Sequence, residues 1–232
     1  MFIGHFAVGF AAKRAAPKAS LGTLMGAALL PDLLWPIFVV VGLEQVRIDP
    51  GNTAVVPLAF VYYPLSHSLA ATAGWALTAA GAFWVATRYR AGAVVVGAAV
   101  ASHWFLDALT HKPDLPLYPG SATYVGLGLW NSVAGTVAVE GLMFGAGLWL
   151  YATGTASRDR IGSTALWAFV ALLVTLYVTS LTGPPAPSAA AVAAADLAGF
   201  LFVIWAAWLD RHRAWASQRP GAPGTLNQAR ER

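Results

Sequence analysis

Three residues in one apolar stretch of the chain have types and spacing suited to chemistry: His103, Asp107 and His111. On an α-helix each step of four residues turns by about 40°, so all three would point to one side. The flanking residues are apolar enough for this helix to lie in a membrane, where histidine and aspartate are costly and usually functional. We expect the helix to end near His111, because Lys112 precedes Pro113 and a residue before proline resists the α conformation.

Further imidazole and carboxylate groups occur in the first half of the chain. His5, Asp32 and His67 lie in or beside apolar segments separate from the one that carries His103. Nitrogen and oxygen ligands of this kind suit zinc, manganese or iron. Six candidate ligands exceed the three or four that one catalytic zinc needs, so a two-metal site stays open. We therefore expect one or two divalent ions, with zinc favoured, that lower the pKa of a bound water to about 7.

Most of these residues also have a structural explanation. His103 and Asp107 could form a private hydrogen-bonded pair, His5 could be a packed residue, and His111 could lie at the membrane interface. The structural explanations do not account well for the whole set, because each would have to explain the costly burial of a separate polar side chain.

Two more candidates lie next to residues that shape the backbone. Asp32 stands between two prolines and could cap a half-helix. Ser66 is a plausible N-cap, which places His67 in the first turn of the next helix. His67 could then be an interfacial residue instead of a ligand.

Glu140 is the carboxylate inside a later apolar stretch, residues 126–152. It could be a ligand, a partner that orients a histidine, or a neutral buried acid. Because a metal-bound water must lose a proton to become a nucleophile, Asp32 and Glu140 are our candidate catalytic residues, as acceptors of that proton.

The composition indicates a membrane protein. The chain of 232 residues is 58% hydrophobic and 10% charged, against roughly 25% charged residues in a soluble domain. It has no cysteine, which excludes disulfides and thiolate ligands. The basic residues lie between apolar segments and in the tail, so we expect the lipid bilayer and not nucleic acid as a partner.

The apolar segments predict an all-α, polytopic protein with about six transmembrane helices and a short N-terminal re-entrant or interfacial helix. Residues 1–12 are too short to span a bilayer, which needs about 20 residues. The expected spans are 20–43, 66–87, 92–111, 126–152, 163–182 and 189–209. The first of them should be discontinuous around Asp32, which is tolerated where a broken helix lines a cavity. Residues 44–64 and 112–124 are expected to be loops.

Lysine and arginine predict the orientation. They gather in residues 13–18, 88–90 and 158–160 and in the tail, and such segments usually face the cytoplasm. The C-terminus would then be cytoplasmic, in what we expect to be a bacterial inner (plasma) membrane. We divide the chain into a membrane-embedded metal-site region (1–153), two additional transmembrane helices (154–210) and a disordered cytoplasmic tail (211–232).

Several short motifs occur together in residues 1–145. They are GH near the start, LPDLLW, SHS, SHWFLDALTH followed by KPDLPL, and LGLWNS with a later Glu. As a set they resemble the membrane-bound metal-dependent hydrolases, a family considered a distant relative of zinc-dependent phospholipase C. The resemblance implies metal ligands at His5, Asp32, His67, His103, Asp107 and His111. It also implies that Asp107 bridges ions and that Asp32 is a ligand or activates water.

One motif of the soluble phospholipases is missing. They complete their metal site with a later His-x-x-x-Glu, whereas no histidine lies here between His111 and His212. Glu140 could substitute in part, and the departure favours one or two ions over three.

We therefore expect a membrane-bound hydrolase that acts on a phosphoester, including one in a lipid. The alternative is a metal-ion or proton transporter that uses the same His/Asp cluster, and a third hypothesis is a structural metal. The absence of an internal repeat and the number of ligands at similar depth favour the enzyme.

Overall fold

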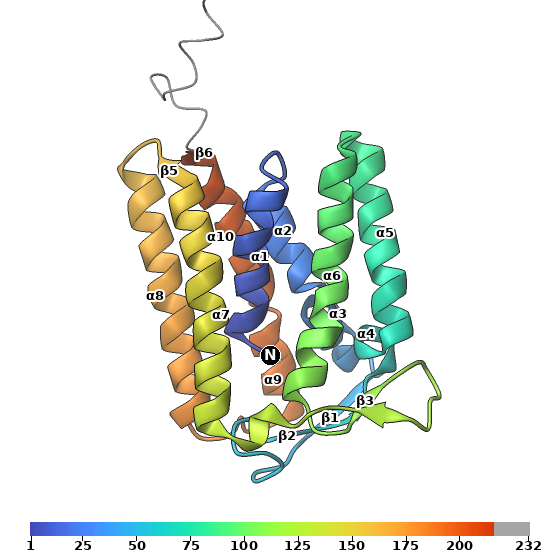
Figure 1. Cartoon of the computed structure of the whole chain (residues 1–232). Coiled ribbons are helices and arrows are strands. Elements are labelled where there is room, and N and C mark those ends of the chain that lie inside the picture. Colours follow the sequence, from blue (N-terminus) through green and yellow to red (C-terminus); the bar gives the residue numbers. More distant parts are fainter. Residues whose placement is uncertain (216–232) are drawn as a thin grey trace, which may run out of the picture.

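Long apolar helices make up most of residues 1–215, the part of the chain that the computed structural model describes. Five are long and apolar enough to cross a membrane: α5 (Leu69–Thr87), α6 (Arg90–Thr110), α7 (Val133–Gly154), α8 (Arg160–Thr182) and the continuous pair α9 (Ala189–Asp196) and α10 (Gly199–Arg211). A bent pair, α2 (Leu21–Ala28) and α3 (Leu30–Val40), makes a sixth if it is counted as one span. The protein is thus an all-α polytopic membrane protein, which confirms the predicted class (Figure 1).

The predicted discontinuity of the first span is the bend between α2 and α3. The two helices meet at Leu29 at an angle of 58°. Pro31 follows in the first turn of α3, where a missing N–H group is tolerated. Pro36 lies inside α3, so the carbonyl of Asp32 has no helical N–H partner. The bend thus places Asp32 in the first turn of a new helix.

The N-terminal helix α1 (Ile3–Ala15) lies inside the bundle (Figure 1). It packs against α7, α2 and α6, and Phe6 and Phe10 are buried in a core shared with α8 and α10. A Cβ atom on Gly147 of α7 would stand 2.3 Å from the Ala7 carbonyl oxygen, so the close approach of the two helices requires glycine there. The helix is therefore enclosed by other helices over most of its length.

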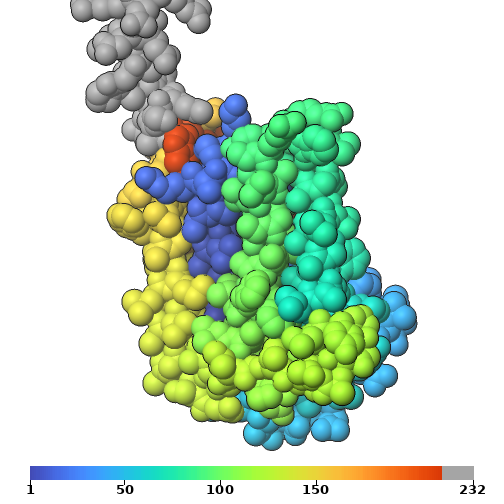
Figure 2. All heavy atoms as spheres, turned by 45° about the vertical axis from the view of Figure 1, so that its right-hand side comes forward, coloured from blue at the N-terminus to red at the C-terminus, as the bar shows by residue number. Residues whose placement is uncertain are grey.

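The two segments expected to be loops contain short antiparallel strands. β1 (Gln45–Ile48) pairs with β2 (Leu58–Tyr62), and β3 (Leu115–Pro116) pairs with β4 (Tyr124–Val125). Both hairpins lie at the end of the bundle where the N-terminus lies. In Figure 2 the segment between α6 and α7 spreads over this end, below α5 and α6. These hairpins cover the end of the bundle at which the predicted site residues lie.

The start of the second span differs from the expectation. A short helix α4 (Pro64–His67) precedes α5, and Ser68 caps α5 by accepting a hydrogen bond from the Ala71 N–H. The predicted cap, Ser66, lies inside α4. Its hydroxyl is therefore free to contact the neighbouring His67 ring.

At the opposite end of the bundle, β5 (Thr155–Ser157) pairs with β6 (Arg213–Trp215). The Arg213 guanidinium donates hydrogen bonds to Thr155, Ser157 and Gly162. Residues 211–215, which we expected to belong to a disordered tail, are therefore ordered, because a buried arginine ties them to the α7–α8 turn. The rest of the expected tail, 216–232, lies outside the described residues.

Candidate metal centre

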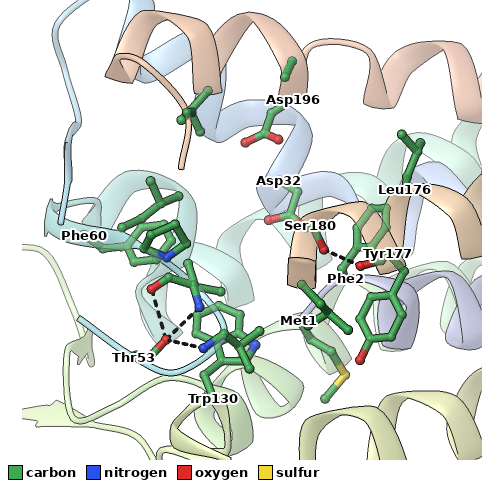
Figure 3. Close-up of a pocket in the computed structure, with 18 of the residues that line it drawn as sticks. Met1, Phe2, Asp32, Thr53, Phe60, Trp130, Leu176, Tyr177, Ser180 and Asp196 are labelled. Carbon is green, nitrogen blue, oxygen red and sulfur yellow. Dashed lines mark hydrogen bonds between the residues drawn. The ribbon is translucent and has the colours of Figure 1, made fainter. Parts of the chain in front are cut away.

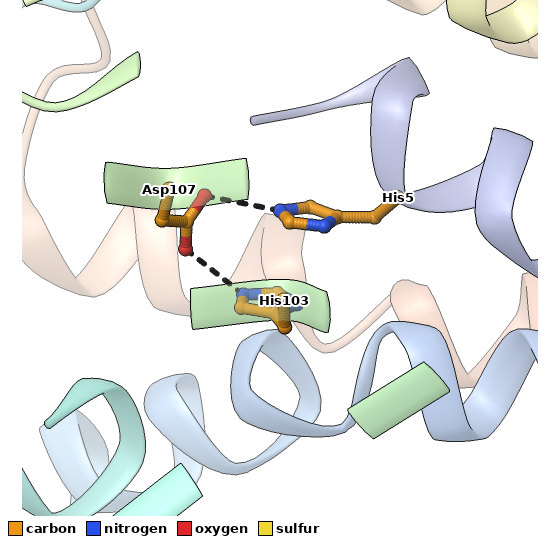
Figure 4. Close-up of side chains that lie close together, drawn as sticks. All are labelled: His5, His103 and Asp107. Atoms are coloured by element: carbon orange, nitrogen blue, oxygen red, sulfur yellow. Dashed lines mark hydrogen bonds and ion pairs between the residues drawn. The ribbon is translucent and has the colours of Figure 1, made fainter. Parts of the chain in front are cut away.

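Five of the six predicted ligands converge on one point: His5 of α1, Asp32 of α3, His67 of α4, and His103 and Asp107 of α6. His5 Nε2 lies 3.1 Å from Asp107 Oδ1, and His103 Nε2 lies 3.1 Å from Asp107 Oδ2 (Figure 4). His67 Nε2 and His103 Nε2 lie 3.3 and 3.4 Å from Asp32 Oδ1. The rings of His5 and His103 stack with centroids 3.7 Å apart. Four separate elements thus bring imidazoles and carboxylates within the reach of shared ions.

The donor atoms form two overlapping groups of three. His5, His103 and Asp107 make one, and Asp32, His67 and His103 make the other; within each group the ligand atoms lie within 4.8 Å of one another. His103 belongs to both, but its Nδ1 lies 2.8 Å from the Ala28 carbonyl oxygen and is the donor there. Only Nε2 then remains, and a nitrogen lone pair binds one ion. A second ion would have to rest on the two remaining ligands of the other group, either His5 and Asp107 or Asp32 and His67.

A buried nitrogen without a hydrogen bond marks the centre of the cluster. His103 Nε2 makes no hydrogen bond in the part of the chain that the structure describes. Carboxylate oxygens of Asp107 and Asp32 nevertheless approach it to 3.1 and 3.4 Å. With the proton on Nδ1, the Nε2 lone pair faces negative oxygens, an arrangement that either a bound cation or protonation of Nε2 relieves. The donor set therefore fits a divalent ion, whose ligands are imidazole nitrogen and carboxylate oxygen.

His67 is oriented by a chain of hydrogen bonds that we did not predict. Ser66 Oγ donates to Glu44 Oε2 at 2.6 Å and lies 2.7 Å from His67 Nδ1. Because the hydroxyl proton goes to Glu44, Ser66 accepts the proton of His67 Nδ1, and His67 Nε2 is left free toward Asp32. Such outer partners fix the ring orientation of metal-binding histidines. Glu44 is a functional candidate that no local spacing pointed to.

The two carboxylates of the cluster differ in exposure. The Asp107 side chain is 2% exposed, whereas that of Asp32 is 42% exposed. Asp32 lines the cavity described below, so it is the carboxylate that water and a substrate can reach. This position suits the predicted role of Asp32 as a proton acceptor.

His111, the sixth predicted ligand, is in neither ligand group. α6 ends at Thr110, and His111 adopts an extended conformation that takes it off the helical face shared by His103 and Asp107. Its Nδ1 lies 2.9 Å from Asp114 Oδ1, and its ring packs 4.3 Å from that of Trp130. Burial lowers the pKa of His111, and the Asp114 carboxylate partly opposes this shift. His111 contributes to the wall of the cavity.

Glu140 also lies outside both ligand groups. Its Oε2 accepts hydrogen bonds from the N–H groups of Phe2 and Gly4 at 2.9 and 3.2 Å. A carboxylate at this place caps the N-terminus of α1 and complements its dipole. The amino nitrogen of Met1, buried beside it, lies 2.6 Å from Asp107 Oδ1. The geometry thus gives Glu140 the task of positioning the segment that carries His5, and its catalytic role stays a prediction.

A cavity of about 850 Å³ lies against the cluster. Its wall includes Asp32, His67, Asp107 and residues of α8, α9 and the β1–β2 hairpin (Figure 3). Asp196 of α9 also lines it, and no hydrogen bond of this carboxylate occurs within the described residues. We did not predict Asp196, although a lone carboxylate in an apolar span is itself a signal. The last membrane segments therefore contribute to the same cavity as the first half of the chain.

No family model, no curated protein and no solved structure matches this chain.

Proposed function

We propose that the protein is a membrane-embedded, metal-dependent hydrolase that acts on a phosphoester. The observation that supports this most is the convergence of His5, Asp32, His67, His103 and Asp107 around a buried nitrogen that has no hydrogen bond within residues 1–215. A divalent ion bound there would supply a Lewis acid and a hydroxide nucleophile near neutral pH. The resemblance of residues 1–145 to membrane-bound hydrolases is consistent with this chemistry.

Each residue of the cluster has a part in this proposal. His103 is held by the Ala28 carbonyl and His67 by Ser66, so their Nε2 atoms point inward as ligands. Asp107 lies between His5 and His103 and can hold a ligand atom toward each of them. Asp32 is the half-exposed carboxylate, and it accepts the proton of the attacking water.

The proposal is tested on the full chain purified in detergent. Metal content is measured first, and hydrolysis of p-nitrophenyl phosphate and bis(p-nitrophenyl) phosphate is then measured with added zinc, manganese or iron. We expect about one or two ions per chain and turnover that EDTA removes. Bound metal without turnover, together with metal uptake into protein-containing vesicles, would instead favour the transporter.

We also propose that the protein lies in a bacterial plasma membrane with its C-terminus in the cytoplasm. The end of the bundle that bears β5 and β6 holds the basic turns, as the distribution of lysine and arginine requires. Because the chain has no cysteine, single cysteines at Tyr118 and Arg158 can be labelled without background. We expect an impermeant thiol reagent to reach position 118 from outside and position 158 only after lysis. The reverse pattern would overturn the orientation.

A further inference from the structure

The cavity beside the cluster has a polar end and an apolar arm. The polar end is formed by Asp32, His67 and Asp107. The apolar arm lies between α8 and the α9–α10 pair (Figure 3). Its wall on these helices is formed mainly by Leu176, Leu181, Val192, Ala195, Ala198 and Phe202, with Ser180 and Asp196 as polar members. A molecule that filled the whole cavity would therefore need one polar and one hydrocarbon part.

The helices around the arm lie among lipid. α8 and the α9–α10 pair are both long and apolar enough to cross the membrane. α9 packs on α3, and α10 packs on α2 and α8, whereas α8 and α9 make little direct contact. On their outer faces Val178 and Leu201 are 49% and 64% exposed. The hydrocarbon closest to the arm is thus the acyl region of the bilayer.

A buried tyrosine forms part of the cavity wall. The Tyr177 side chain lies on α8, with 6% of the residue exposed. Its ring stacks on Phe2, and both residues line the cavity. The two rings therefore add an aromatic surface to the wall of the arm.

We propose that the arm binds the hydrocarbon chain of a membrane lipid whose phosphate head reaches the His/Asp cluster. This inference rests on the proposed function and names its substrate class, an amphiphilic phosphoester. The Tyr177 ring is part of the wall that the hydrocarbon chain contacts. The cavity volume of about 850 Å³ is within the roughly 300–1,000 Å³ of pockets that enclose an organic ligand.

A matched pair of variants tests the arm. Ala195 and its neighbour Ala194 are both exposed, but Ala195 lines the cavity and Ala194 does not. Ala195→Trp should fill the arm, and Ala194→Trp should add the same ring on the lipid side. The probe is a phosphatidic acid with a photoreactive diazirine at the end of one acyl chain, used in phosphatidylcholine vesicles that contain the full-length protein. Labelled peptides are identified by mass spectrometry, with and without excess unlabelled phosphatidic acid.

We expect competable labelling of residues 176–181 and 192–199 in the unchanged protein and in Ala194→Trp, and its loss in Ala195→Trp. Tyr177→Phe serves as a conservative control. It keeps the aromatic ring in the cavity wall and should leave the competable labelling unchanged. Labelling that no competitor reduces, or equal labelling of both tryptophan variants, would overturn the proposal.

This readout does not depend on turnover. Hydrolysis of water-soluble dihexanoyl phosphatidic acid is compared separately with hydrolysis of the dioleoyl lipid. Competable labelling without any hydrolysis would leave the lipid site standing and refute the hydrolase. Hydrolysis of soluble phosphoesters without competable labelling would support the hydrolase and refute the arm as a lipid site.

Discussion

Helix α1 carries a buried polar side chain near each end, and the two surroundings differ in whether the buried polar atoms have hydrogen-bond partners. At the Lys13 end, Nζ donates to the Ala19 carbonyl at 2.7 Å and to Asp210 Oδ2 at 2.6 Å. Asp210 also accepts hydrogen bonds from the Leu21 N–H and the Tyr151 hydroxyl. At the His5 end, nitrogens of His5 and His103 are buried without a hydrogen bond in the described part of the chain.

The charges of the two clusters differ in the same way. Lys13 and Asp210 form a balanced pair. Around His5 there are two carboxylates, Asp32 and Asp107, and the Met1 amino group offsets one of them. The first cluster is complete and joins α1 to α10, whereas the second has one carboxylate more than fixed positive charges, which a bound cation could balance. The comparison shows that burial of a polar group does not by itself indicate a ligand site. A stronger indication is a buried polar group that lacks a hydrogen-bond partner.

Removal of a ligand from the incomplete cluster should have the largest effect. We expect His103→Ala and Asp107→Ala each to reduce metal affinity by more than the roughly 10–100-fold typical of an outer partner. Both variants should also lower the melting temperature, because metal binding stabilises the folded state. Elemental analysis and thermal unfolding with and without EDTA measure this. Metal content equal to that of the unchanged protein would refute the metal centre.

Substitutions in the Lys13–Asp210 cluster should change the stability of the protein but not its metal content. Lys13→Met leaves the carboxylate of Asp210 buried without its cation, which should cost about 3–5 kcal/mol of unfolding free energy. Metal content per folded chain should not change. The double variant Lys13→Met/Asp210→Leu should recover most of the loss, since no lone charge remains. A loss of metal in Lys13→Met would show that the two ends of α1 are not independent.

Ser66→Ala tests the hydrogen bonds that orient His67. We expect metal affinity to fall about 10- to 100-fold, with a small change in stability. Ser102→Ala is the control, because among the described residues the Ser102 hydroxyl donates its hydrogen bond to the Ala99 carbonyl on the neighbouring turn of α6. Competition with a metal chelator of known affinity gives both values. The same affinity in the two variants would remove Ser66 from the site.

His111→Ala should keep its metal, in contrast to His103→Ala. The ring of His111 is hydrogen-bonded to Asp114 and lies outside both ligand groups. Loss of the ring should reduce hydrolysis, because it changes the cavity wall. The metal affinity should stay within about 2-fold of that of the unchanged protein, well below the 10–100-fold effect of losing a residue that supports a ligand. A loss as large as that in His103→Ala would return His111 to the ligand set.

The smallest effect is expected for His212→Ala. His212 Nδ1 lies 2.8 Å from Asp159 Oδ2 at the exposed end of the bundle. The hydrogen bond from His212 lowers the pKa of the Asp159 carboxyl group. The ionised Asp159 therefore stabilises the fold fully above the ordinary aspartate pKa, and this stabilisation is lost as the pH falls through the lowered pKa. The variant should lose this weak acid dependence and keep its metal, as melting curves from pH 2 to 6 and metal analysis would show.

The sequence predicted the helices better than the strands. The spans followed from the length of the apolar segments, and the bend at Leu29 followed from the nearby prolines. Strand β2, with the sequence LAFVY, has residues typical of strands, but its surroundings suggested only a loop.

The site was predictable where it depends on local spacing. His103 and Asp107 share a face because they are one helical turn apart, whereas His111 leaves that face because the helix ends one residue earlier. Glu44 and Asp196 were missed, since each reaches the site through a tertiary contact that no short spacing records.

The place of α1 also has a consequence for biogenesis. With 13 residues, this helix is too short to partition across a bilayer by itself, which takes about 20 residues. Its position depends on Gly147 of α7, which leaves room for the backbone at Ala7. α1 can therefore take its final depth only after α7 has been synthesised and inserted. His5 then joins the other cluster residues late, and the newly made chain assembles the His/Asp cluster only after most of its helices are in the membrane.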